Sequence, residues 1–270
     1  MLSSIGHSNT LTFQSVSSST LNVQEQYTAE ILLLGCSGHL PASPKRNAGM
    51  KRLLVVTGTA ILVAIVAAAV LPPRATPSIR EFDADRIARL ELSMWQAYYD
   101  KERVRLFGLL VVTLREQFHF SWATATSTAF RLARAAARFG DAKSDYDTVL
   151  PDLTRAYEAI KSHSDGMFDP SVVARAELAW WVARRVPGQN APEQVGQLIA
   201  REYADMYDAP IDDMARAGLL RAQAGALRDA EAGRPDWRTI ARLLQESYQS
   251  LHATLSSTPA SAKRTGTAMG

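Results

Sequence analysis

Residues 83–99, DADRIARLELSMWQAYY, decide the fold class. Apolar side chains recur here at intervals of three and four positions, so a helix would gather them on one face: Ile87, Leu90, Met94, Trp95 and Tyr98. Asp83 stands just before this stripe, where a short polar side chain can accept hydrogen bonds from the first free backbone N–H groups. The stretch therefore predicts an amphipathic helix that begins after Asp83.

The chain repeats this pattern as far as Ser256. No run of residues alternates between apolar and polar with a period of two, which argues against strands. Breakers divide the sequence into segments of helical length, at Gly140, Ser162–Gly166, Pro187-Gly188, Ala209-Pro210 and Gly233–Pro235. Helix-start signals lie near them, at Ser121, Asp169-Pro170, Asn190 and Asp236. We predict an all-α fold for residues 79–256, an irregular bundle of about seven helices.

A long apolar segment precedes this bundle. Residues 53–71, LLVVTGTAILVAIVAAAVL, carry no charge and follow Lys51-Arg52. As a helix they would be about 28 Å long, which matches the hydrocarbon thickness of a bilayer. We predict a single N-terminal membrane-spanning helix that anchors the chain through residues 50–71, with the lipid bilayer as the partner of residues 53–71. The alternative is a secretory signal cleaved after the small residues Ala67–Ala69.

The charges that flank this segment predict its orientation. Four basic residues stand before it, Lys45, Arg46, Lys51 and Arg52, and basic residues favour the cytoplasmic side. We therefore expect a bacterial inner (cytoplasmic) membrane protein with its N-terminus in the cytoplasm and its helical domain, residues 79–256, extracytoplasmic. Residues 1–49 read as a disordered extension or a mis-assigned start upstream of Met50, residues 72–78 as a linker, and residues 257–270 as a disordered tail.

The charge balance argues against nucleic-acid binding. The pI of about 9.1 is basic. From Pro72 onward, however, the chain has 26 basic and 25 acidic residues, a net charge of +1. No nucleic-acid-binding motif is present either. We expect no nucleic-acid partner and a folded part that carries no basic face.

Two glutamates inside similar octapeptides are the candidate site residues. Residues 88–95, ARLELSMW, and 174–181, ARAELAWW, share the pattern A-R-x-E-L-x-x-W. Helical spacing puts Glu91 and Glu177 on apolar stripes, where a carboxylate needs an arginine, tryptophan or tyrosine partner. These glutamates either fix the helix packing or belong to a ligand- or partner-binding pocket, whose predicted residues are Glu91, Trp95, Tyr98, Glu177, Trp180 and Trp181.

A third interpretation adds the Glu-x-x-His pair Glu116 and His119. With Glu91 and Glu177, this set resembles the ferritin-like di-metal carboxylate bundles, in which Glu and His three positions apart reach one metal ion. The resemblance covers four residues, and the second Glu-x-x-His of that family is missing. It implies an exported metal-dependent enzyme with Glu91, Glu116, His119 and Glu177 as ligands.

The sequence lacks the common catalytic signatures. It has no phosphate-binding glycine-lysine loop, no G-x-S-x-G, no H-E-x-x-H and no C-x-x-C. We therefore expect a membrane-anchored, non-catalytic helical domain that contacts a protein partner or a small ligand on the extracytoplasmic side, without a cofactor. The metal-dependent enzyme is the alternative.

Overall fold

The computed structural model describes residues 78–230 and 235–257, and six separate residues before them: Thr59, Val63, Ala64, Val66, Ala69 and Val70. The chain divides into two compact units, residues 1–65 and 66–270. Most of the predicted anchor lies outside the described residues, as do residues 1–49, 72–77 and 258–270. The predictions for those segments stay predictions. None of the described helices is both long enough and apolar enough to span a bilayer.

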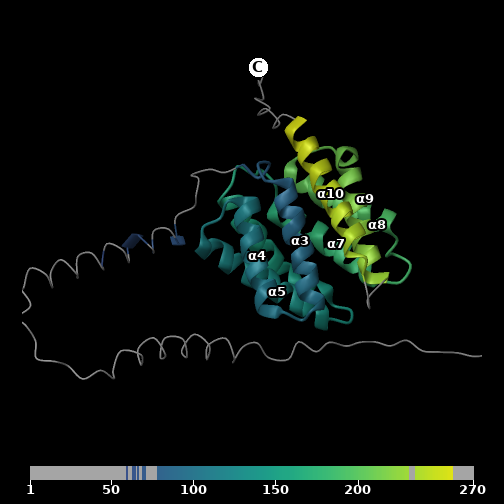
Figure 1. The fold of residues 1–270 in the computed structure, drawn as a ribbon, viewed down its shortest axis with the longest axis horizontal. Coiled ribbons are helices and arrows are strands. Elements are labelled where there is room, and N and C mark those ends of the chain that lie inside the picture. The colour runs from purple at the N-terminus through teal and green to yellow at the C-terminus, as the bar shows by residue number, and fades with distance from the viewer. Residues whose placement is uncertain are drawn as a thin grey trace, which may run out of the picture. The chain divides into compact units, whose positions relative to one another are not determined.

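The second unit is all-helical over its described residues, as the sequence predicts (Figure 1). It has eight α-helices and one 3₁₀ helix, and these residues form no strand. The elements are α3 (Ala84–Tyr99), α4 (Arg103–Phe118), α5 (Trp122–Asp141), η1 (Tyr146–Val149), α6 (Leu150–Ser162), α7 (Pro170–Arg185), α8 (Pro192–Tyr207), α9 (Ile211–Ala230) and α10 (Trp237–Ser257).

The predicted helix starts are mostly confirmed. The side chain of Asp83 accepts a hydrogen bond from the Arg86 backbone N–H at 2.9 Å, and Ser121 accepts one from Thr124 at 3.1 Å. Asp169 and Asp236 cap α7 and α10 in the same way. Helix α8 differs, because it begins after Ala191 and no side chain caps it. Asn190 is therefore not the cap that the sequence predicts.

The extra helix arises at residues 100–102. The sequence predicts about seven helices because no glycine or proline marks this turn, yet the chain reverses there between α3 and α4. Lys101 adopts a left-handed backbone conformation, with φ of 60°, and the Glu102 N–H donates to the Ala97 carbonyl at 2.9 Å. This geometry ends a helix even without the glycine that usually supplies it.

The helices pack in a closed circuit. Each α-helix packs against the next one along the chain, and α10 packs back against α3. The centre holds fully buried apolar side chains from most of the helices, among them Ile87, Leu153, Ile199, Met214 and Leu244. Segments far apart in sequence therefore meet in one core.

Helices α8 and α9 approach most closely at Gly196 and Gly218. A Cβ atom on Gly218 would overlap the Gly196 carbonyl oxygen and lie 2.8 Å from the Ala200 backbone nitrogen. Those atoms belong to the backbone and cannot rotate away. The absence of side chains at these two positions therefore sets the distance between the two helices.

Replacing Gly218 with alanine should destabilise the chain by about 1–3 kcal/mol, because the two backbones must move apart. Gly108 of α4 is the matched control, since a Cβ there would meet nothing within 4 Å. Gly108→Ala should stabilise by about 0.5–1 kcal/mol through helix propensity. Chemical denaturation of the detergent-solubilised full chain measures both. Equal effects of the two substitutions would contradict the close approach of α8 and α9.

Candidate functional site

The site is built around an ion pair in the core. Glu91 of α3 is only 3% exposed. Arg221 of α9 donates to its Oε1 from Nη2 at 2.7 Å and from Nε at 3.1 Å. Tyr248 of α10 donates to its Oε2 at 2.6 Å. The prediction that buried Glu91 has an arginine or tyrosine partner is confirmed, and it has both. Burial opposes ionisation, but Arg221 and Tyr248 hold the pKa of Glu91 below its usual range.

Trp180 of α7 connects this ion pair to a second buried carboxyl group. The Arg221 guanidinium carbon lies 5.0 Å from the centre of the Trp180 ring, a cation–π contact. The Trp180 indole N–H donates to Oε2 of Glu202 at 2.5 Å, and the Tyr157 hydroxyl donates to Oε1 of the same residue at 3.1 Å. One chain of polar contacts therefore joins α3, α9 and α10 to α6, α7 and α8.

Glu177 is the poorly satisfied member of this network. The residue as a whole is half-buried, but its Oε2 atom is inaccessible and has no hydrogen-bond partner among the described residues. Burial and the neighbouring Glu202 raise its pKa to about 8, and burial also raises the pKa of Glu202. The two carboxyl groups together therefore hold a proton near neutral pH.

A small cleft lies beside the ion pair. Its volume is about 50 Å³, and its walls come from α3, α7, α8 and α9. The lining residues are Glu91, Trp95, Trp180, Arg184, Ile199, Arg221, Ala222 and Gly225. Glu91, Trp95 and Trp180 are thus three predicted site residues that the fold brings to one place.

Two further charged residues stand next to this cleft. The Arg228 guanidinium carbon lies 4.3 Å from the centre of the Trp95 ring. Asp229 accepts hydrogen bonds from Nη2 of Arg228 at 2.8 Å and from Nη2 of Arg184 at 2.5 Å. Burial and the positive charge of Arg228 lower the pKa of Arg184, although Asp229 opposes this shift. The Asp229 carboxylate therefore pairs with two guanidinium groups.

The other predicted pocket residues lie elsewhere. Tyr98 is 55% exposed and contacts the Tyr99 ring edge-on. Trp181 packs against Phe139, with 5.3 Å between the ring centres. Glu177 interacts with Tyr157 and Glu202 and does not line the cleft.

The four residues of the metal hypothesis have separate partners. Glu116 lies 3.7 Å from Arg86 at the surface, and Nε2 of His119 lies 2.8 Å from the Glu81 carbonyl oxygen. Glu91 is held in its ion pair with Arg221. Across residues 78–230 and 235–257, no three acidic, histidine or cysteine side chains come close enough to share a metal ion.

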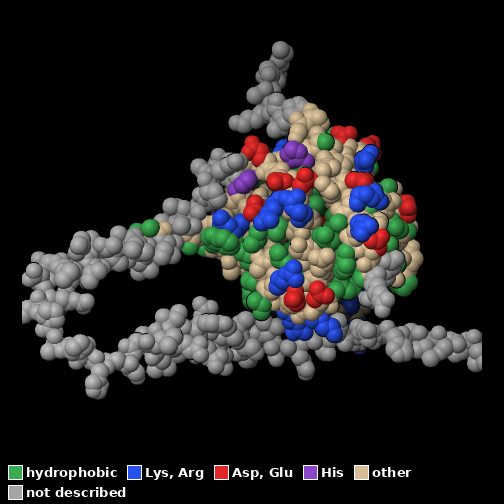
Figure 2. Space-filling view, in the orientation of Figure 1, with side chains coloured by type: hydrophobic (Ala, Val, Ile, Leu, Met, Phe, Trp, Pro, Cys, Tyr) green, Lys and Arg blue, Asp and Glu red, His purple; other side chains and the backbone are tan. Residues whose placement is uncertain are grey.

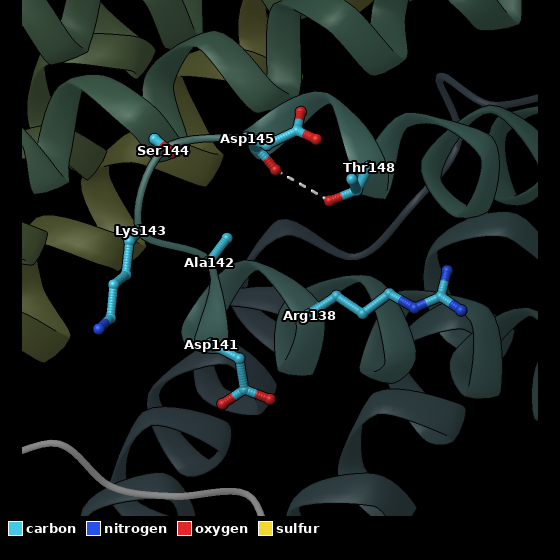
Figure 3. A pocket seen from close by; sticks show the side chains of 7 residues that line it. All are labelled: Arg138, Asp141, Ala142, Lys143, Ser144, Asp145 and Thr148. Atoms are coloured by element: carbon cyan, nitrogen blue, oxygen red, sulfur yellow. Dashed lines mark hydrogen bonds between the residues drawn. The ribbon is translucent and has the colours of Figure 1, made fainter.

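A larger hollow of about 670 Å³ lies at the loop between α5 and η1. Figure 3 shows that its charged side chains, including Arg138, Asp141 and Lys143, point in different directions. The one hydrogen bond drawn there joins the Thr148 hydroxyl to the Asp145 carbonyl at 3.0 Å. This hollow is an open loop surface without convergent groups, so the cleft beside Arg221 is the better candidate site.

Sequence reasoning missed the arginines of the site. Arg221 and Arg228 stand on a stripe of small residues in α9, at the spacing of one helix face: Ala217, Gly218, Arg221, Ala222, Gly225 and Arg228. A stripe of small residues indicates close packing, and a charge within it indicates a buried ion pair. That pattern could have predicted Arg221, but nothing in it indicates Glu91 as the partner.

No family model, curated protein or solved structure matches this chain.

The raised pKa of Glu177 predicts an unusual pH dependence of stability. The unfolded chain loses this proton near the ordinary value of 4.5, while the folded chain keeps it to about pH 8. The contribution of Glu177 to stability is therefore fully present below pH 4.5, the pKa of the unfolded chain. It declines as the pH rises to about 8, the pKa in the folded chain. A difference of one pH unit between the folded and unfolded pKa corresponds to about 1.4 kcal/mol. Glu177→Gln should leave stability at about pH 4 nearly unchanged and raise it at about pH 8 by more than about 1 kcal/mol.

Glu91→Gln is the matched control with the opposite sign. The pKa of Glu91 is lowered in the folded chain, so its contribution is present above 4.5 and declines below it. This variant should lose about 3–5 kcal/mol at neutral pH and less in acid. Chemical denaturation across the pH range measures both variants. Destabilisation of Glu177→Gln at about pH 8 would show that Glu177 is an ordinary satisfied core group.

Proposed function

We propose that this chain is a membrane-anchored, non-catalytic binding domain whose cleft beside Arg221 takes up a carboxylate group. The carboxylate belongs to a small organic acid or to an acidic side chain of a protein partner. The supporting observation is the convergence of two tryptophans and two arginines, Trp95, Trp180, Arg184 and Arg221, on one cleft. Arginine presents several N–H groups in a plane that matches a carboxylate.

The charges around the cleft favour an anion. Arg184, Arg221 and Arg228 face two carboxylates, Glu91 and Asp229, so one guanidinium charge is not balanced within this set. Glu202 lies behind Trp180, and burial raises its pKa, which weakens it as a counter-charge. A carboxylate in the cleft would supply the balancing charge, and its hydrogen bonds to guanidinium groups would offset the cost of removing it from water.

The size of the cleft limits what can enter. Its volume of about 50 Å³ exceeds the roughly 30 Å³ that one water molecule occupies in the liquid, which suits a carboxylate group. It is far smaller than the several hundred Å³ of typical cofactor sites. The larger part of any ligand would therefore lie outside the cleft.

The chemistry of the lining favours binding over catalysis. The cleft residues include no serine, cysteine or histidine, and the one carboxylate, Glu91, already accepts three hydrogen bonds from Arg221 and one from Tyr248. A general base must be free to take a proton. The alternative, an exported metal-dependent enzyme, lacks support because its predicted ligands Glu91, Glu116 and His119 each have a separate partner.

The sequence supports the location. The uncharged residues 53–71 have the length of a membrane span, and Lys51-Arg52 before them favours a cytoplasmic N-terminus. The cleft would then face the extracytoplasmic side of a bacterial inner membrane.

Acetate is the simplest probe of the cleft. Titrating it into the detergent-solubilised chain, with chloride replaced so that ionic strength stays constant, should shift the indole N–H resonances of Trp95 and Trp180 saturably. A ligand of so few atoms should bind with a dissociation constant of about 1–100 mM. Nuclear magnetic resonance of ¹⁵N-labelled chain measures the shifts.

Two comparisons make the acetate test specific. Gly225→Val places a branched side chain in the cleft and should abolish the shifts. The Trp122 indole, exposed on α5, should not respond in either protein. A response that Gly225→Val leaves intact, or the absence of any saturable shift, would contradict carboxylate binding in this cleft.

A further inference from the structure

Basic residues outnumber acidic ones on helices α4 and α5. Helices α4 and α5 together carry six arginines against Glu116 and Asp141, a net charge of +4. The rest of residues 78–257 carries 17 basic and 23 acidic residues, a net charge of −6. Three of these arginines pair with carboxylates outside the two helices, Arg105 with Glu102 and both Arg134 and Arg138 with Asp152, so part of this charge is balanced locally. The near-neutral charge of the folded part as a whole conceals this excess of basic residues on two consecutive helices.

The outer surface of these two helices also carries exposed apolar side chains. On α4, Val104 is 89% exposed and is followed one turn later by exposed Gly108. On α5, Trp122 is 47% and Phe130 58% exposed, and exposed, uncharged Thr126 lies between them at helical spacing. We call these five residues the α4–α5 outer face. Figure 2 shows hydrophobic side chains on the side of the domain where α4 and α5 lie, with basic and acidic side chains among them.

Arginines flank the exposed aromatic rings directly. The Arg115 guanidinium carbon of α4 lies 4.1 Å from the centre of the Trp122 ring of α5, so the stripes of the two helices meet at this end. The Arg134 guanidinium carbon lies 5.8 Å from the Phe130 ring centre. Arg103 and Arg105 stand on either side of Val104. Aromatic and aliphatic side chains bordered by arginine are typical of surfaces that lie in the headgroup region of a bilayer.

We propose that the α4–α5 outer face lies on the surface of an anionic lipid bilayer, with Val104, Trp122 and Phe130 inserted among the headgroups. With the paired Glu102 and Asp152 included, α4, α5 and these two partners carry a net charge of +2, which complements acidic phospholipids, and the acidic remainder of the domain is repelled by them. The predicted membrane anchor would also hold the domain near the bilayer. Its linker, residues 72–78, spans at most about 25 Å and would keep the domain beside the membrane. This inference does not depend on what the cleft binds.

Spin labels on the full chain test the proposal. The one native cysteine, Cys36, is replaced by serine, and a nitroxide is attached through Phe130→Cys. A second protein carries the label through Met167→Cys as the matched control, because Met167 is 84% exposed in the loop between α6 and α7. Both are reconstituted in nanodiscs of phosphatidylglycerol mixed with phosphatidylcholine, and in nanodiscs of phosphatidylcholine alone.

Collision rates with oxygen and with a water-soluble nickel chelate report the surroundings of each label. In anionic nanodiscs, the label at 130 should favour oxygen over nickel, as at a depth of about 5–10 Å, and the label at 167 should favour nickel. In nanodiscs of phosphatidylcholine alone, the preference of the label at 130 for oxygen over nickel should fall toward that of the label at 167. The double change Arg105→Gln and Arg131→Gln should have the same effect in anionic nanodiscs. Nickel preference at 130 in anionic nanodiscs would overturn the proposal. Exclusion of both reagents would overturn it too, since it would show that protein covers the face.

Discussion

The ion pair between Glu91 and Arg221 is the interaction on which the rest of the structure depends. Removing a carboxylate and a guanidinium from water costs several kcal/mol each, so the pair is tolerable only when its geometry is good and its remaining hydrogen bonds are made. Arg221 meets Glu91 with two nitrogens, and Tyr248 supplies the second carboxylate oxygen with a donor. Trp180 covers the guanidinium face. These contacts fix α3, α7, α9 and α10 relative to one another, and the cleft lies beside the ion pair, between α3, α7, α8 and α9.

Two other features of the core accompany the buried ion pair of Glu91 and Arg221. The glycines of α8 and α9 let those helices approach until their backbones touch, which brings Glu202 of α8 to the other side of Trp180. Glu177 is then held beside Glu202 with a buried oxygen that has no partner among the described residues. A carboxyl group of this kind lowers stability at neutral pH, and proteins that retain such groups often do so at binding sites.

Much of the fold could be predicted because amphipathic stripes, helix caps and helix breakers are short patterns that can be seen in the sequence. Asp83, Ser121, Asp169 and Asp236 begin helices as predicted, and Glu91 has the arginine and tyrosine that its buried stripe requires. The turn at Lys101 was missed because a lysine takes the left-handed conformation usually left to glycine. The partners Arg184, Arg221 and Asp229 were missed since only tertiary packing brings them to Trp95 and Trp180. The basic excess of α4 and α5 was missed for a different reason: it can be counted in the sequence, but the charge was summed over the whole folded part.

A double-mutant cycle between Glu91 and Arg221 tests the central claim most directly. Glu91→Gln, Arg221→Met and the double variant are compared by chemical denaturation of the solubilised full chain at neutral pH. Each single change should cost about 3–5 kcal/mol because it leaves the other charge buried and unpaired. The double variant should cost much less than their sum, with a coupling energy of about 3 kcal/mol. Single costs that add to within about 0.5 kcal/mol would contradict the account, since they would show that the two residues act independently.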